Sequence, residues 1–227
     1  MFLYNLVDKF LMRDFSDELI NNLNSKKPII FDVGCFIGNF SRNLKKKLNL
    51  KNKNFYLFDA NPNLKIQGFK YNNLVFSDKI QKRNFYLNEF FPSSGSSLKG
   101  DTKNDIKWNY TRKIITLSPN KGFKLLKVKT NTIDNFCKNN KITKIDILKI
   151  DVEGSEFEVL KGSKKILNQT HLIQLEIYQN KKNFSKIEKK ITALLKEYNF
   201  KKIKEKKIWS VSLFSNLISK DVLFVKS

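Results

Sequence analysis

Apolar positions recur along the first third of the chain with two different periods. In residues 3–24 they fall at helical spacing on both sides of a break near residues 14–16, which predicts one or two amphipathic helices. Continuous apolar runs at residues 28–34 and 54–62, ending at Gly34 and just after Asp59, predict buried strands. Residues 39–50 between them carry apolar side chains on one helical face, so a helix is expected to connect the two strands.

The same alternation continues to the end of the chain. We expect weaker strands at 73–76 and 83–88, and stronger ones at 125–131, 144–151, 171–178, 200–211 and 221–225. Helices are expected at 132–140, opened by Thr132, at 155–167, beginning near Ser155, and at 184–198. Strands that alternate with helices indicate an α/β fold, with about seven mostly parallel strands and helices on both faces.

One long segment, residues 89–124, breaks this alternation. Serines, glycines and polar residues dominate it, with Trp108 and Tyr110 among them. Connections of this length are uncommon unless they act as lids or binding loops or are disordered. We therefore predict a helical appendage at 1–27 and one domain at 28–227, in which 89–124 is a flexible insertion or a lid over an acceptor.

The chain of 227 residues has a formal net charge of +23, with 44 lysines and arginines against 21 acidic residues. Such a field attracts polyanions at low salt. Only four of the basic residues are arginines, although arginine is the residue that grips phosphates and base edges in a bidentate manner. The lysines are scattered and accompany many Asn, Ile and Phe residues, a mixture typical of A/T-rich coding. The charge is thus weak support for a nucleic-acid partner.

Cysteine and histidine are scarce. Cys35 and Cys137 are too few for a disulfide scaffold and form no CxxC motif, and the single histidine, His171, is expected to be structural. No His/Cys cluster indicates zinc. No apolar run approaches the roughly 20 residues of a membrane span, and the N-terminal residues do not resemble a signal peptide, so a cytoplasmic location is expected.

Ligands of such sheets bind at the carboxyl ends of the strands. At the first strand, Asp32 is followed by Gly34 and Gly38, which bracket a turn into the next helix without the GxGxxG dinucleotide fingerprint. An acid before this turn suits a cationic or zwitterionic ligand better than a diphosphate. At the second strand, the carboxylate of Asp59 could accept hydrogen bonds from both hydroxyls of a ribose, or it could cap the helix that follows.

Further carboxylates follow the later strands. Asp78 could accept a hydrogen bond from an adenine amino group or belong to an ordinary turn. Asp151 and Glu153 follow a buried strand, and Glu176 lies near the end of the next strand. A carboxylate there could deprotonate a hydroxyl, whereas Glu156 is expected to cap the following helix.

Taken in order, these motifs resemble the FkbM family of S-adenosylmethionine-dependent methyltransferases. The resemblance runs from about residue 28 to residue 178 and rests on FDVGCFIGNFS, FDANP, FSD, TIDNF and KIDVEGSEFEVLKGS. It implies a Rossmann-like class I methyltransferase sheet of seven strands with an antiparallel last strand. It also implies O-methylation of a hydroxyl on a small-molecule or glycan acceptor, such as a sugar in a polysaccharide, glycolipid or secondary metabolite.

The resemblance also assigns roles to residues. Binding of S-adenosylmethionine, and of the product S-adenosylhomocysteine, falls to Asp32, Gly34, Cys35, Gly38, Asp59, Ala60, Asp78 and Asp151. Catalysis falls to Asp151, Glu153 and Glu176, with Asp151 as the first candidate for the base. The chain departs from the family pattern at EIY, residues 176–178, where family members often have EIH, so a histidine-based mechanism is not expected. A divalent metal held by the three catalytic carboxylates is a less favoured alternative.

Three rival functions remain open. A nicotinamide-dependent oxidoreductase is disfavoured by the missing GxGxxG motif. A nucleic-acid methyltransferase is suggested by the charge, but DVEG stands where base amino methyltransferases have Asn/Asp-Pro-Pro-aromatic. A non-catalytic basic binding protein on the same fold would have no need of the glycine turn and both acids.

Overall fold

The computed structural model describes residues 15–64, 66–89, 96–100, 110, 122–208 and 216–227. Most of segment 89–124, including Trp108, lies outside these residues, as do residues 1–14. Tyr110 is described and is 67% exposed.

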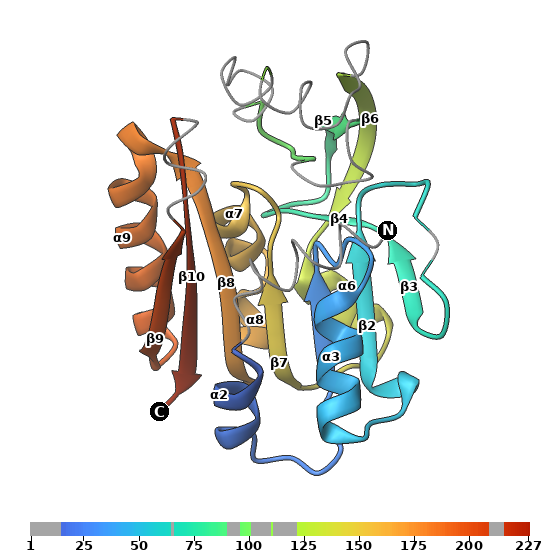
Figure 1. Ribbon diagram of the computed structural model, residues 1–227, viewed down its shortest axis with the longest axis vertical. Helices are drawn as coiled ribbons and strands as arrows, with labels where there is room; N and C mark the ends of the chain where they lie inside the picture. The colour runs from blue at the N-terminus through green and yellow to red at the C-terminus, as the bar shows by residue number, and fades with distance from the viewer. Residues whose placement is uncertain (1–14, 65, 90–95, 101–109, 111–121, 209–215) are drawn as a thin grey trace.

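The described chain contains a seven-stranded sheet in the order β3-β2-β1-β7-β8-β10-β9 (Figure 1). Its strands are β1 (Ile30–Val33), β2 (Phe55–Asp59), β3 (Lys70–Asn73), β7 (Ile145–Ile150), β8 (Thr170–Asn180), β9 (Phe200–Ile208) and β10 (Leu217–Lys226). Neighbours from β3 to β8 pair in parallel, and β10 is antiparallel to both β8 and β9. The predicted mostly parallel sheet with an antiparallel last strand is confirmed.

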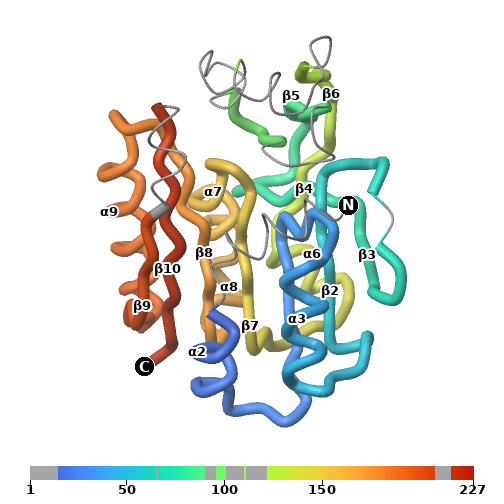
Figure 2. Tube along the Cα trace, in the orientation of Figure 1, coloured from blue at the N-terminus to red at the C-terminus, as the bar shows by residue number. Residues whose placement is uncertain are grey.

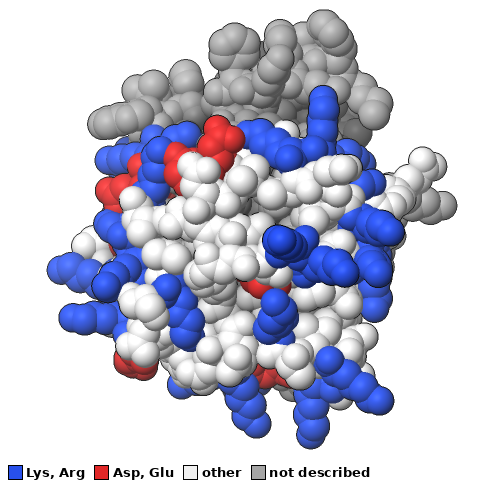
Figure 3. All heavy atoms as spheres, turned by 90° about the horizontal axis from the view of Figure 1, so that it is seen from below, with Lys and Arg blue, Asp and Glu red and all other residues white. Residues whose placement is uncertain are grey.

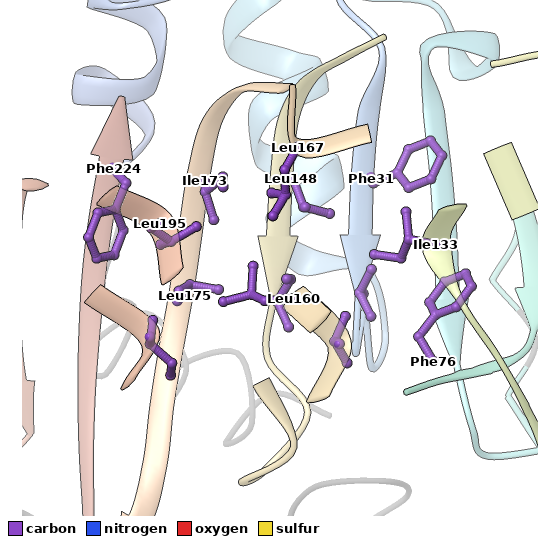
Figure 4. Packing of buried hydrophobic residues seen from close by; sticks show 14 of the residues in the cluster. Phe31, Phe76, Ile133, Leu148, Leu160, Leu167, Ile173, Leu175, Leu195 and Phe224 are labelled. Carbon is purple, nitrogen blue, oxygen red and sulfur yellow. The ribbon is translucent and has the colours of Figure 1, made fainter. Parts of the chain in front are cut away.

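Helices cover both faces of this sheet. On one face, α2 (Ser16–Asn21) and α3 (Asn39–Leu48) bury Leu19 and Leu44 against apolar strand residues. The other face carries α6 (Ile133–Asn139), α7 (Glu156–Lys161), α8 (Lys164–Leu167) and α9 (Lys181–Glu197). Their apolar side chains, among them Leu160 and Leu195, pack on the sheet in the cluster of Figure 4. Burial of this apolar area is the main stabilising contribution to the fold.

The predicted helical appendage is in contact with the sheet where it is described. Phe15 and Leu19 are buried, and the ring of His171, at the start of β8, makes a 2.8 Å hydrogen bond to the carbonyl oxygen of Asn22. The helix therefore shares the core of the domain, and the proposed boundary at residue 27 stays a prediction.

A second, three-stranded sheet has the order β4-β6-β5. It consists of β4 (Val75–Phe76), β5 (Lys82–Asn88) and β6 (Phe123–Asn131), with β5 and β6 antiparallel and β4 parallel to β6. Figures 1 and 2 show β5 and β6 above the carboxyl ends of the large sheet. The predicted single strand at 73–76 is wrong, because Asn73 ends β3 of the large sheet whereas Val75 and Phe76 pair with β6.

The predicted helix at 155–167 is also divided, into α7 and α8, with Gly162 and Ser163 between them. Gly162 lies so close to the loop after β4 that a Cβ atom there would be 2.1 Å from the carbonyl oxygen of Ser77. This close approach of two backbones is the physical reason for the break, and apolar periodicity carries no information about it. Thr132, by contrast, caps α6 as predicted, accepting a hydrogen bond from the amide of Asn135.

Candidate functional site

A cavity of about 380 Å³ opens at the carboxyl edge of the large sheet. Its walls come from the loops after β1, β2 and β7, from β4, β5, β8 and β10, and from the N-terminal part of α3. Of the residues predicted for the site, those that line the cavity are Gly34, Cys35, Asp59, Ala60, Asp151, Glu153 and Glu176. Asp32, Gly38 and Asp78 lie outside its lining.

The glycine turn is held against the end of β7. Gly34 and Gly38 both have positive φ angles, 76° and 79°, which side chains rarely adopt. A Cβ atom on Gly34 would be 1.7 Å from the carbonyl oxygen of Asp151, so only glycine fits there. The amides of Gly34 and Cys35 donate to the carbonyl oxygen of Phe58, at 2.9 and 3.1 Å. The turn is thereby fixed to both neighbouring strands, and Gly38 is the N-cap of α3.

Cys35 lines the cavity as a neutral thiol. Burial, together with the neighbouring carboxylates of Asp32 and Asp59, raises the pKa of its thiol above the ordinary range. A thiol that stays protonated is a poor nucleophile, so Cys35 contributes a small apolar surface to the wall of the cavity.

Asp59 ends β2 and connects two loops. One carboxyl oxygen accepts from the amide of Phe36 at 3.0 Å, and the other from the amide of Asn61 at 2.9 Å. Only 8% of Asp59 is exposed, and burial raises its pKa to about 6 despite these hydrogen bonds. Each carboxylate oxygen has a second lone pair, so both can still accept a hydroxyl proton from a ligand in the cavity. The described residues after Asp59 form no regular helix that it could cap.

Lys149 also lines the cavity and was not among the residues predicted for the site. Its ammonium group is 3.2 Å from Asp32 and 3.3 Å from Asp151, and the Asp32 carboxyl also accepts from the hydroxyl of Ser41 at 2.7 Å. Burial alone would lower the pKa of Lys149, but the two carboxylates outweigh it and hold that pKa above its usual range. Asp32 is fully buried and so acts on the cavity through Lys149. The sequence carries no clear signal for this role, because the same stretch, residues 144–151, also contains Lys144 and Asp146.

Asp151 and Glu176 both line the cavity, and their carboxyl groups interact there as a pair. Burial raises the pKa of Asp151 well above the usual value, and the charge of Glu176 raises it further, while Lys149 opposes the shift. Two neighbouring carboxyl groups oppose each other's ionisation, so the pair titrates as a unit. The hydroxyl of Ser219 on β10 also contacts Glu176. Such a pair can accept a proton at a pH where an isolated carboxylate would be a weaker base.

Glu153 belongs to a strained turn that the small sheet holds in place. Its φ angle is 55°, and the hydroxyl of Ser97 donates to its carbonyl oxygen at 2.7 Å. Ser97 in turn pairs through its backbone with Tyr86 of β5, at 2.8 and 3.1 Å. Lys99 forms an ion pair with Glu158 of α7 at 3.1 Å. Residues 97–99 therefore connect the small sheet to the loop that carries the catalytic candidates.

Two other acids named from the sequence, Glu156 and Asp78, have partners outside the cavity. Glu156 lies in the first turn of α7, as expected, and its carboxyl accepts from the amide of Gly154 at 2.8 Å. It therefore also fixes the turn that precedes this helix. Asp78 forms an ion pair with Lys161 at 3.2 Å. Burial would raise the pKa of Asp78, but the hydrogen bond and charge of Lys161 lower it overall. A contact of Asp78 with an adenine stays a prediction.

Among the described residues, no group of three or more His, Cys, Asp or Glu side chains is placed to hold a metal ion. The proposed metal trio of Asp151, Glu153 and Glu176 therefore gains no support from this geometry. None of the helices in these parts of the chain is long and apolar enough to cross a membrane.

Comparison with known proteins gives a consistent match over most of the chain. A family model described as the methyltransferase FkbM domain matches residues 32–202. The chain is 27% identical over 169 residues to the 2-O-methyltransferase NoeI of Sinorhizobium fredii (strain NBRC 101917 / NGR234), a match that covers 70% of this chain and 67% of that protein.

Solved structures with a similar course of the chain include the methyltransferase FkbM of Methylobacillus flagellatus KT. The identity is 9% and the TM-score 0.45, covering 87% of this chain but only 44% of that one. Another is the magnesium protoporphyrin IX methyltransferase of Synechocystis PCC 6803 with bound SAH, at 11% identity and a TM-score of 0.44, covering 93% of this chain and 80% of that one.

Proposed function

The chain belongs to the FkbM methyltransferase family, and from this premise we propose that it is an S-adenosylmethionine-dependent O-methyltransferase acting on a sugar hydroxyl. The acceptor we propose is a sugar unit of a polysaccharide, glycolipid or secondary metabolite. The observation that carries the proposal is the carboxyl pair Asp151–Glu176, which lies in the same cavity as the glycine turn. A cytoplasmic location stays a prediction.

The chemistry of the lining supports binding of the cofactor. Gly34 and Cys35 offer backbone and a small apolar surface, and Asp59 with Ala60 offers a carboxylate beside a small side chain for a ribose. When bound, S-adenosylmethionine supplies a methyl group on a positively charged sulfonium, which is transferred to the acceptor oxygen with cleavage of the C–S bond. A lining with five carboxyl side chains and one lysine favours a ligand that bears positive charge.

Asp151 is the proposed base. A sugar hydroxyl is a weak nucleophile, so a carboxylate that accepts its proton during transfer accelerates the reaction. Asp151 directly follows β7, and its side chain is 29% exposed, against 12% for its partner Lys149. The charges of Glu176 and Glu153 both act on Asp151, which makes these two residues secondary candidates. Holding the acceptor oxygen in line with the methyl group is the remaining contribution of the site.

Nucleic-acid methylation and non-catalytic binding are the alternatives. The many surface lysines give the first some support, and Figure 3 shows them spread over the face below the sheet. The acidic lining of the cavity is unsuited to a phosphate backbone, and this observation favours the sugar hydroxyl.

Thermal unfolding in the presence of S-adenosylmethionine, S-adenosylhomocysteine, NAD and NADP tests the proposal. A ligand at 100 times its dissociation constant adds about 2.7 kcal/mol, which raises the unfolding midpoint by several degrees. We expect a shift with the two adenosyl compounds only. A shift with NAD instead would refute the methyltransferase proposal, and no shift with any of them would favour the binding protein.

A further inference from the structure

Part of the cavity extends from the glycine turn toward β8 and β10. This acceptor limb, as we name it, is lined by Gln174 and Glu176 of β8 and by Asp221 of β10. Glu176 and Asp221 are direct neighbours in the antiparallel pairing of the two strands. Gln174 precedes Glu176 by two residues, so both side chains are on the same face of the sheet.

Gln174 is the informative residue of the limb. It is only 6% exposed, it lines the cavity, and its amide oxygen is buried without a hydrogen-bond partner among the residues that the structure describes. Nearly all buried polar side-chain atoms in folded proteins are hydrogen-bonded, so an exception calls for a specific explanation. A ligand that donates a hydrogen bond from within the cavity would satisfy this oxygen.

The charged groups around Gln174 restrict the kind of ligand that can donate this hydrogen bond. Its neighbour across the parallel pair, Lys149, is held by Asp32 and Asp151. Toward β10 the limb carries Glu176 and Asp221, of which Asp221 is only 5% exposed. A phosphate or carboxylate placed there would face carboxyl groups of the same sign in a partly desolvated site, whereas a hydroxyl group can donate to them.

We propose that the acceptor limb binds an uncharged polyhydroxy acceptor and that Gln174 accepts a hydrogen bond from one of its hydroxyls. The proposal rests on the methyltransferase function and deepens it. It makes Gln174 a specificity-determining residue beside the base Asp151, and it excludes acceptors that carry a phosphate next to the methylated hydroxyl.

The test uses methyl transfer from labelled S-adenosylmethionine to a panel of methyl glycosides, the corresponding sugar phosphates and a short RNA. We expect label in one or more uncharged glycosides. Gln174→Met keeps the length of the side chain but removes the accepting oxygen, and it should lower kcat/KM for that glycoside at least ten-fold, mainly through KM. Gln174→Glu, which keeps an oxygen, should recover part of the loss. Gln67→Met, a change of the same kind at an exposed glutamine, should have no effect.

Binding of S-adenosylhomocysteine, measured by calorimetry, separates the two proposals. We expect its dissociation constant in Gln174→Met to stay within two-fold of the wild-type value. A parallel loss of this affinity would make Gln174 a cofactor contact and overturn its assignment to the acceptor. Unchanged kcat/KM, label only in phosphorylated compounds or RNA, or no label in any glycoside while the wild type binds the adenosyl compound would also overturn it. A wild type that does not bind S-adenosylhomocysteine would refute the methyltransferase function itself.

Discussion

The carboxyl groups at this edge of the sheet differ in how readily they ionise, because each has different immediate partners. Asp32 is fully buried against Lys149, Asp59 accepts from two backbone amides, and the charge of Glu176 raises the pKa of Asp151. The sequence alone predicts acids at strand ends, since a break in an apolar run is visible. It cannot predict their protonation, which depends on which strands become neighbours.

Replacing Asp151 by Asn tests its role as base. We expect turnover to fall by about 10²–10⁴-fold, because the amide cannot accept the proton, while the affinity for S-adenosylhomocysteine changes little. In the wild type, kcat/KM should decline with falling pH well above the range of an ordinary carboxyl, because the pKa of Asp151 is raised. The measurement is steady-state kinetics over pH with calorimetry of cofactor binding.

Asp17→Asn is a matched control for this change, since the side chain of Asp17 is 81% exposed and forms an ion pair with Lys47 on the surface. Full turnover in Asp151→Asn would show that another group accepts the proton.

Glu156 should make the protein less stable as the pH rises, whereas an acid in a salt bridge makes it more stable. Burial raises its pKa from 4.5 to about 8, so the folded state retains a proton that the unfolded state loses. Its contribution to stability is therefore present below about pH 4.5 and is lost as the pH rises toward 8. Glu156→Gln imitates the protonated form. We expect the free energy of unfolding of this variant, relative to the wild type, to be higher at pH 9 than at pH 5, by at most about 5 kcal/mol.

Urea denaturation at both pH values measures this difference, with the exposed Glu197→Gln as control. An identical pH dependence of wild type and Glu156→Gln would contradict it.

At the scale of elements, prediction from the sequence succeeds where a segment is strongly periodic and fails where two backbones meet. The strands β1, β2 and β7 and the helix α9 lie close to the predicted ranges because long apolar patterns determine them. The split at residues 73–76 and the break at Gly162 result from pairing with β6 and from contact with Ser77, which are both long-range contacts. Lys149, Gln174 and Asp221 were missed for the same reason, since they face the cavity only through the pairing of their strands.

Gly162→Ala tests the close approach between α7 and the loop after β4. The new Cβ atom would be 2.1 Å from the carbonyl oxygen of Ser77, so the loop or the helix must move. We expect a loss of about 1–3 kcal/mol in the free energy of unfolding, measured by urea denaturation. Gly122→Ala, whose Cβ atom would meet nothing within 4 Å, should change it by less than about 0.5 kcal/mol. Equal effects of the two changes would show that the contact is unimportant.

For the whole molecule, the net charge of +23 and the acidic lining of the cavity act on different ligands. Composition alone predicted the first and left open whether a nucleic acid is the partner. The acidic lining of the cavity could be recognised only from the fold, because carboxyl groups at the ends of β2 and β7 and on β8 and β10 meet only when the sheet has formed.

We therefore expect RNA to bind weakly and without effect on the site. Its affinity should fall steeply as salt rises from about 50 to 200 mM, as for a purely electrostatic interaction. Saturating RNA should leave the dissociation constant of S-adenosylhomocysteine unchanged. Fluorescence anisotropy with a labelled RNA measures the salt dependence of RNA affinity, and calorimetry measures the dissociation constant of S-adenosylhomocysteine. Salt-resistant RNA binding that depends on the adenosyl compound would favour the nucleic-acid methyltransferase.

Because β5 pairs with β6, the length of the connection between these two strands has little influence on the stability of the domain. Asn88 pairs with Phe123, and the amide of Glu89 donates to the carbonyl oxygen of Gly122 at 2.9 Å, so the two ends of the connection are already joined. Closing a loop that is twice as long costs only about 0.6 kcal/mol more. A change in the length of the chain between residues 100 and 122 should therefore leave both sheets in place, while Ser97 and Lys99 keep their contacts with the loop after β7 and with α7.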